Sequence, residues 1–156
     1  MEALIEEYGL GYKMLREAIN CLSEEELRFK PAPNKWSIHQ VLIHVADSEL
    51  VSTQRLKKVL AEEEPLLTSP DQDAWANALG YDQLDREQYL LLFELLRSSM
   101  LPILAQLTTE QVKRVGVYAD EGRFTFKQLL EYRVEHIRGH LAQIERLKKE
   151  YRQRQV

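Results

Sequence analysis

The chain has 156 residues, of which 44% are hydrophobic and 29% are charged, and its net charge is −4 at pH 7. This composition is typical of one globular domain over residues 1–156 and excludes a disordered chain, and the scattered basic residues do not predict nucleic-acid binding. The one cysteine, Cys21, excludes an internal disulfide and a cysteine-based zinc site, so a transition metal would have to rely on the four histidines.

Two long segments with helical periodicity make up the first part of the chain. Residues 3–21 and residues 37–63 both repeat apolar side chains at the spacing of a helix face. The second segment begins with a capping box, in which the side chains of Ser37 and Gln40 satisfy free backbone N–H groups. Another capping box at Ser23 starts only a short turn, because two prolines follow it.

Two further helices are predicted after a long connection. Residues 66–84 are too many for a structureless loop, which indicates a crossover or a functional lid. Helices are predicted over residues 85–107, where Pro102 should cause a kink or a break, and over residues 125–151. Residues 115–124 between them have the pattern of a small hairpin. The sequence therefore predicts an all-α protein, a four-helix bundle with a short hairpin before the last helix.

The first residues carry no basic region and no long apolar run, and Glu94 interrupts the longest apolar cluster. They predict neither a signal peptide nor a membrane span. A free cysteine suits a reducing compartment. We therefore expect a cytoplasmic protein that does not bind membranes.

Three of the four histidines can face one another across two helices. His136 and His140 are four residues apart, so they differ by about 40° around the helix and can chelate one ion, although an isolated pair at this spacing often binds nothing. His44 borders the apolar stripe of its helix, whereas His39 lies about 140° away in the first turn, where we expect it to be exposed. If the two helices pair, His44, His136 and His140 form a three-nitrogen set with open positions, as in a catalytic site, and Zn²⁺, Ni²⁺ and Fe²⁺ all suit it.

Two motifs together resemble the DinB/YfiT-like superfamily. They are Trp36-Ser37-Ile38-His39-Gln40-Val41-Leu42-Ile43-His44 and the distant His136-Ile137-Arg138-Gly139-His140. The resemblance implies an up-down-down-up bundle, a divalent metal ion held by His44, His136 and His140, and a homodimer. Gln40 stands where many members carry Glu, and this difference should affect the helix start rather than the metal. Members are commonly labelled metal-dependent hydrolases, and better-understood relatives are bacillithiol S-transferases and a mycothiol-dependent maleylpyruvate isomerase.

The implied site suits two reactions on a small-molecule substrate. A metal ion with three neutral ligands can lower the pKa of bound water, which gives a hydrolase. It can also bind a low-molecular-weight thiol cosubstrate as a thiolate, which gives an S-transferase. The alternative to an enzyme is a non-catalytic metal-binding or dimerising helical module, including a stress-related one.

Three side chains at helical spacing from the histidines are candidates for supporting roles. Asp47 can orient a histidine or act as a catalytic base, but it can equally be one of many solvated acids. Arg55 and Tyr132 can bind substrate, Arg55 through an anionic group, with a surface ion pair and a core position as the alternatives. Cys21 is expected to be a small buried residue.

Overall fold

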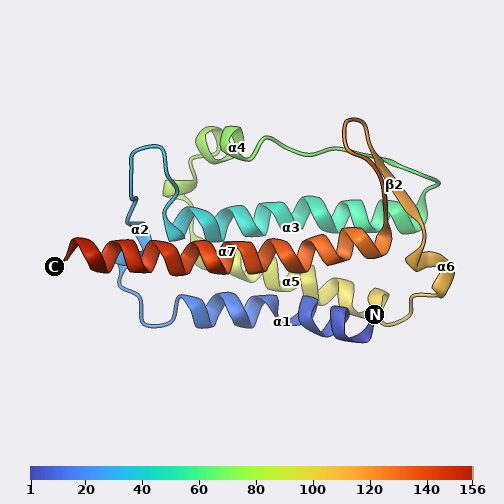
Figure 1. The fold of residues 1–156 in the computed structure, drawn as a ribbon, viewed down its shortest axis with the longest axis horizontal. Helices are drawn as coiled ribbons and strands as arrows, with labels where there is room; N and C mark the ends of the chain where they lie inside the picture. The colour runs from blue at the N-terminus through green and yellow to red at the C-terminus, as the bar shows by residue number, and fades with distance from the viewer. Residues whose placement is uncertain (156) are drawn as a thin grey trace.

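The computed structural model describes residues 1–155 and consists mostly of helices (Figure 1). Four long helices form a bundle: α1 (Glu2–Ala18), α3 (Ile38–Ala61), α5 (Arg86–Leu104) and α7 (Phe126–Arg154). Short helical segments lie in the connections: α2 (Glu24–Arg28), α4 (Gln72–Ala78), the 3-10 turn η1 (Tyr81–Gln83) and α6 (Thr109–Val112). The predicted four-helix bundle is confirmed. No helix within residues 1–155 is long and apolar enough to cross a membrane.

The long helices follow an up-down-down-up order (Figure 1). Helices α3 and α5 run in one direction, and α1 and α7 run in the opposite direction. Each of α1 and α3 packs against both α5 and α7. Because α3 and α5 are parallel, the chain must return along the bundle between them. Residues 62–85 make this return and contact α3 through α4 and η1, so the long connection is a crossover.

Side-chain caps mark where three of the four bundle helices begin. Ser37 forms a capping box with Gln40 at the start of α3, and Thr125 forms one at the start of α7. The carboxylate of Asp85 accepts a hydrogen bond from a backbone N–H in the first turn of α5. These side chains satisfy N–H groups that the helix itself leaves free. The predicted starts of all three helices are confirmed.

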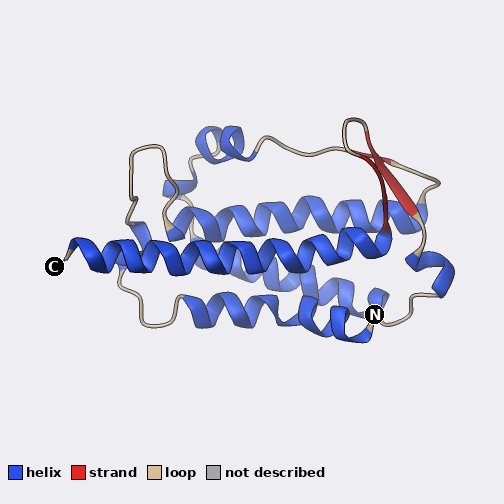
Figure 2. Cartoon of the chain, in the orientation of Figure 1, coloured by secondary structure: helices blue, strands red, loops and turns tan. Residues whose placement is uncertain are grey.

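A small three-stranded sheet lies over one end of α3 (Figure 2). Strands β2 (Val115–Tyr118) and β3 (Gly122–Thr125) form the predicted antiparallel hairpin, and β1 (Leu66–Leu67) of the crossover pairs in parallel with β2. The sequence did not predict β1, because two residues carry no alternating pattern. Gly116 lets the hairpin approach α3 closely, since a Cβ there would lie 2.8 Å from Cγ2 of Val59.

Two apolar clusters fill the bundle, and a buried charge connects them. One cluster contains Phe93 and the other contains Tyr8, both fully buried. The guanidinium of Arg97 lies over both rings, 4.7 Å from the centroid of Phe93 and 4.1 Å from that of Tyr8. Arg97 is itself buried. The interior is therefore not purely apolar.

Cys21 is exposed, which corrects the expectation that it is buried. It follows the end of α1 and has a φ of 61°, in the left-handed region that reverses the chain direction. Its side chain therefore lies on a turn outside the apolar face of α1.

Candidate metal centre

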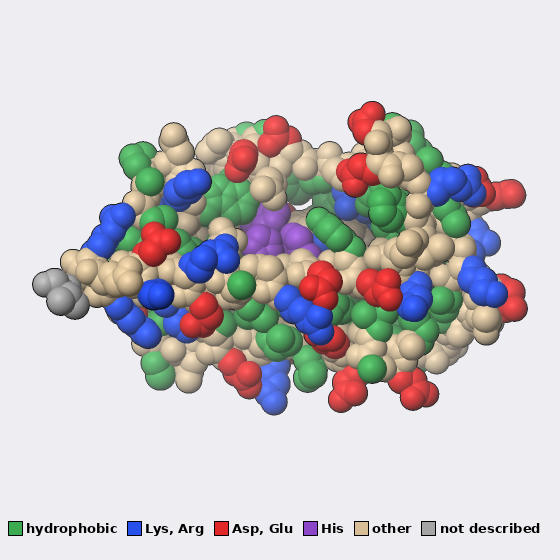
Figure 3. All heavy atoms as spheres, viewed as in Figure 1, with side chains coloured by type: hydrophobic (Ala, Val, Ile, Leu, Met, Phe, Trp, Pro, Cys, Tyr) green, Lys and Arg blue, Asp and Glu red, His purple; other side chains and the backbone are tan. Residues whose placement is uncertain are grey.

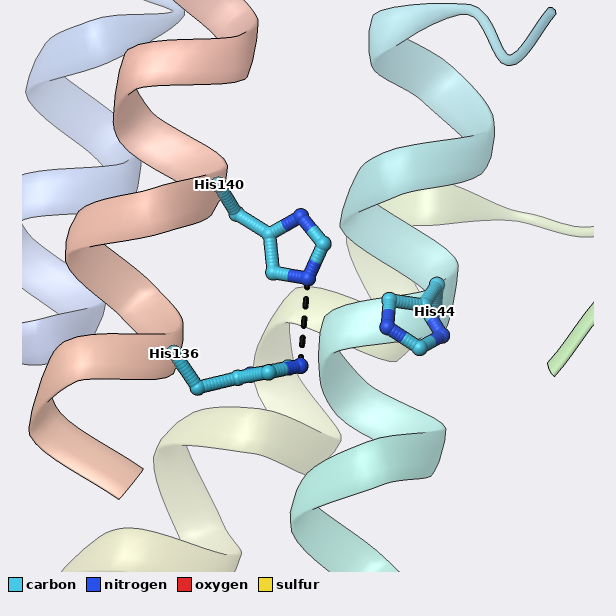
Figure 4. Close-up of side chains that lie close together, drawn as sticks. All are labelled: His44, His136 and His140. Carbon is cyan, nitrogen blue, oxygen red and sulfur yellow. Dashed lines mark hydrogen bonds between the residues drawn. The ribbon is translucent and has the colours of Figure 1, made fainter. Parts of the chain in front are cut away.

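Three of the four histidines converge between two helices (Figure 4). His44 extends from α3, and His136 and His140 extend from α7, one turn apart. One ring nitrogen of each lies within 4.8 Å of those of the other two. The structure thus brings together the three residues that the helix geometry and the family resemblance selected.

The ring nitrogens of this cluster fit a divalent cation. Nδ1 of His140 lies 2.8 Å from Oε1 of Gln143, so its N–H donates to Gln143 and leaves the lone pair on Nε2. This Nε2 lies 3.1 Å from Nε2 of His136, and two nitrogens that share one Zn²⁺ at about 2.0–2.1 Å are separated by roughly 3.0–3.4 Å. Nε2 of His44 is buried and has no hydrogen-bond partner within residues 1–155. A cation among these nitrogens would supply the missing partner.

Burial keeps the three imidazoles neutral at pH 7. The pKa of His44 falls from the ordinary 6.5 to about 3, because burial disfavours the charged form and because His140 and Arg133 lie nearby. Burial, followed by Arg133, lowers the pKa of His136. Burial also lowers the pKa of His140, although the hydrogen bond to Gln143 opposes it. Neutral imidazole is the form that binds a metal ion.

A pocket of about 130 Å³ opens beside the histidines. Its walls include His44, His136 and Asp47, and α7 adds Tyr132 and Arg133. Figure 3 shows the histidine side chains at the bottom of an opening between α7 and the crossover. The cluster is therefore accessible from outside on one side, as a site that admits a substrate must be.

Asp47 lies in the pocket wall and is hydrogen-bonded to a residue of the crossover. The O–H of Tyr81 donates to Oδ2 of Asp47 at 2.5 Å. Burial raises the pKa of Asp47, although this hydrogen bond opposes the change. Within residues 1–155 Asp47 forms no hydrogen bond with a histidine, and its role as a catalytic base stays a prediction. Tyr81 was missed in the sequence because the crossover has no periodicity that would place it.

Arg55 and Tyr132 line the same pocket. Arg55 donates to the backbone oxygen of Thr68 from Nε and Nη2, and to Oγ of Ser69 from Nη2. Tyr132 is 62% exposed, and its ring centroid lies 6.1 Å from that of His136. A surface ion pair for Arg55 and a core position for Tyr132 are therefore both wrong, and substrate binding by these residues stays a prediction.

His39 is buried, at 1% exposure, which corrects the expectation that it is exposed. Its Nε2 lies 3.0 Å from the backbone oxygen of Tyr81, and its Nδ1 lies 3.4 Å from Nη1 of Arg86. The crossover covers the start of α3 at this point. His39 thus holds the crossover in place and is not one of the three clustered histidines.

A second polar cluster is buried where all four long helices meet, and it was not predicted from the sequence. Both oxygens of Glu49 accept hydrogen bonds, from Tyr8 at 2.7 Å and from Arg97 and Arg133 at 3.1 Å each. Burial raises the pKa of Glu49, but the two guanidinium groups outweigh it, so the pKa lies below the ordinary value. The available signal was a charged residue on the core-facing stripe of α3, where Glu49 shares the face of Val45.

The fold and the three-histidine cluster define a helical-bundle protein with a candidate metal centre beside an open pocket. The chain belongs to the DinB superfamily, whose sequence profile matches residues 8–144. This match covers α3 and α5 and parts of α1 and α7, and it includes the three clustered histidines.

Curated relatives and a solved structure agree with this assignment. A "Putative metal-dependent hydrolase" of Oceanobacillus iheyensis is 31% identical over 83% of this chain and 75% of its own length. The protein YfiT of Bacillus subtilis strain 168, which carries the same description, is 30% identical over 85% of this chain and 75% of its own. A solved structure of YfiT, described as "a probable metal-dependent hydrolase with an unusual four-helix bundle topology", is similar with a TM-score of 0.88 and 27% identity. That similarity covers 95% of this chain and 85% of the solved one.

Proposed function

We propose that this protein is a metal-dependent hydrolase of small-molecule substrates, in which His44, His136 and His140 hold one divalent ion. The observation that carries the proposal is the convergence of three neutral imidazoles on one point beside an open pocket. Relatives named as metal-dependent hydrolases support the reaction class. Zn²⁺, Ni²⁺ and Fe²⁺ all suit three nitrogen ligands.

A divalent ion held by His44, His136 and His140 would supply a Lewis acid and would lower the pKa of bound water toward 7. The protein's own side chains then accept the proton and position the reacting groups. Asp47 accepts the hydrogen bond of Tyr81 through Oδ2, which leaves Oδ1 for a proton taken from water in the pocket. Because burial raises the pKa of Asp47, its carboxylate is a stronger base than an exposed one. Tyr81 holds that carboxylate toward the pocket.

A thiol S-transferase is the second candidate. The one cysteine of the chain, Cys21, is exposed and does not line the pocket of the histidines. A thiol nucleophile must therefore enter with a low-molecular-weight cosubstrate. The open pocket argues against a non-catalytic module, whose metal site would not need an entrance. The homodimer implied by the family stays a prediction, which sedimentation analysis of the purified protein would test.

One activity screen separates these candidates. The metal-loaded protein is assayed against a panel of esters and amides, and in parallel against electrophiles with several low-molecular-weight thiols. We expect turnover of an ester or amide, which His140→Ala abolishes together with bound metal. Asp47→Asn should retain the metal and lower kcat by about 10²–10⁴-fold. Turnover only in the thiol panel would identify an S-transferase, and metal binding without turnover in either panel would favour the module.

A further inference from the structure

A second hollow adjoins the pocket of the histidines. It lies between the hairpin and the first turns of α7, and we call it the hairpin hollow. It shares Arg55, Ser69 and Tyr132 with the histidine pocket, and it continues to Tyr118 and Phe124. Figure 3 shows hydrophobic side chains gathered between the histidines and the hairpin on this face. The two hollows are therefore neighbouring parts of one depression.

The volumes of the two hollows indicate which part of a ligand each can hold. The histidine pocket has a volume of about 130 Å³, whereas the hairpin hollow has about 350 Å³. Small-molecule sites in proteins usually enclose about 300–1,000 Å³. The histidine pocket can thus hold only the reacting group of a typical metabolite, and the hairpin hollow has room for the rest of the molecule.

Arg55 stands at the junction with unused hydrogen-bonding capacity. A guanidinium has five N–H donors, and those of Arg55 that are bonded lie on Nε and Nη2. Within residues 1–155, Nη1 has no hydrogen-bond partner and Arg55 forms no ion pair with an acid. Arg133 places a second, buried cation in the wall of the histidine pocket. The junction is therefore a favourable position for one anionic group.

The remaining walls limit what else the ligand can carry. Tyr118 and Phe124 pack edge to face, with their centroids 5.7 Å apart, and both are only half-buried. They offer apolar surface to a ring or a short aliphatic chain. Glu121 and Glu131 also line the hairpin hollow, and their carboxylates disfavour a second negative charge at that end.

We propose that the hairpin hollow is the binding site for the body of the substrate, and that the substrate is a monoanion whose carboxylate binds Arg55 while an uncharged aromatic or aliphatic part contacts Tyr118 and Phe124. This inference rests on the proposed function only for the position of the reacting group at the histidines. Arg55 thus selects substrates that carry a carboxylate, and the hairpin selects the uncharged part of the substrate.

The test is a calorimetric titration of the metal-loaded protein with three probes: 3-phenylpropionate, its neutral amide and acetate. We expect 3-phenylpropionate to bind at least tenfold more tightly than either of the others. Arg55→Gln should remove the preference for the carboxylate over the amide. Equal binding of acid and amide by the unmodified protein, or no binding of either, would overturn the proposal.

Two further variants sharpen this test. Gln128→Glu puts a carboxylate on the rim of the hairpin hollow and keeps the capping box of α7, because Glu at this position also accepts the N–H of Thr125. It should weaken 3-phenylpropionate at least threefold and leave the amide unchanged, and an unchanged acid affinity would contradict the proposal even if Arg55→Gln failed to fold. Arg123→Gln makes the same charge change as Arg55→Gln outside the hollow and should have no effect on either probe.

His140→Ala separates this inference from the proposed function. Metal analysis of this variant tests the metal centre alone. The variant should bind 3-phenylpropionate within about twofold of the unmodified protein, because Arg55 and the hairpin remain. If binding is lost in His140→Ala but kept in Arg55→Gln, the carboxylate binds the metal and the proposal is wrong.

Discussion

The bundle contains two polar clusters that share helices α3 and α7, and they differ in whether the central group has hydrogen-bond partners inside the protein. In the charged cluster, both oxygens of Glu49 accept bonds from Tyr8, Arg97 and Arg133. In the histidine cluster, Nε2 of His44 and Nδ1 of His136 have no partner within the described part of the chain, and in the charged cluster the same holds for Nε of Arg97 and Nε of Arg133. Glu49 and Arg97 lie in the core, whereas His44 and His136 line a pocket whose wall Arg133 also reaches.

A buried polar group that has partners inside the protein stabilises the fold, whereas one without a partner is available to bind a ligand. Buried polar groups are nearly always paired, because an unpaired one loses its bonds to water without compensation. The carboxylate of Glu49 has found its partners inside the protein. Nε2 of His44 has not, whereas both guanidinium groups of the charged cluster bond Glu49 through Nη2. We therefore infer that the histidines serve a ligand from outside. Removing a group should therefore affect stability in the first cluster and ligand binding in the second.

The largest effect on stability is expected for Glu49→Ala. The substitution leaves the guanidinium groups of Arg97 and Arg133 buried without a counter-charge, which typically costs about 3–5 kcal/mol. Urea unfolding followed by circular dichroism measures it. The control is Glu87→Ala, which removes an exposed pair with Arg16 and should cost no more than about 1 kcal/mol. A loss below about 1 kcal/mol for Glu49→Ala would show that the charged cluster does not hold the bundle.

The next effect comes from crowding the same cluster. A Cβ on Gly11 would lie 2.3 Å from Nη1 of Arg97, so Gly11→Ala must displace that guanidinium. Such overpacking costs about 1–3 kcal/mol. The matched control is Gly139→Ala in α7, where nothing lies within 4 Å of the added Cβ. There the free energy of unfolding should rise by about 0.5–1 kcal/mol, because alanine is a better helix former than glycine. The same sign for both variants in urea unfolding would contradict the packing around Arg97.

A smaller effect is the dependence of stability on pH, which differs between the two clusters. The folded pKa of His44, about 3, lies below its unfolded value near 6.5. The unfolded chain therefore binds more protons between these values, and stability falls as the pH drops below about 6.5. His136, His140 and His39 have lowered pKa values too and add to this fall. The pKa of Glu49 in the folded protein lies below the ordinary 4.5, so Glu49 adds to the loss of stability only when the pH falls below about 4.5.

Thermal unfolding between pH 7 and pH 5, with a chelator present, measures this dependence. The melting temperature should fall with pH in the unmodified protein and fall less steeply in His44→Gln. It should keep the same slope in Glu87→Ala, which alters no buried group. Parallel curves for the unmodified protein and His44→Gln would mean that His44 does not titrate in the predicted direction.

The sequence predicted the bundle well because its signals are local. Capping residues such as Ser37 and Thr125 and the apolar stripes fix helix starts and faces within a few residues of themselves. The same periodicity placed His136 and His140 on one face. These predictions required no knowledge of how distant segments pack.

The errors at His39 and Tyr81 share one cause, which is contact between segments distant in the sequence, whereas the error at Cys21 comes from a local turn. His39 is buried because Tyr81 of the crossover covers it, and no sequence pattern near His39 predicts this contact. The hydrogen bond between Tyr81 and Asp47 joins residues 34 positions apart. Glu49 differs, because its position on the core face of α3 was visible in the sequence and indicated a buried partner.

The metal content of five proteins tests the central claim most directly. The unmodified chain, His44→Ala, His136→Ala, His140→Ala and His39→Gln are loaded with Zn²⁺ or Ni²⁺, desalted and analysed for metal, with circular dichroism to confirm folding. His39→Gln is the matched control, because an amide N–H can still donate to the backbone oxygen of Tyr81. The account predicts one ion per chain in the unmodified protein and in His39→Gln, and none in the other three. Retention of the ion by all three of those variants, or its absence from the loaded unmodified protein, would contradict the account.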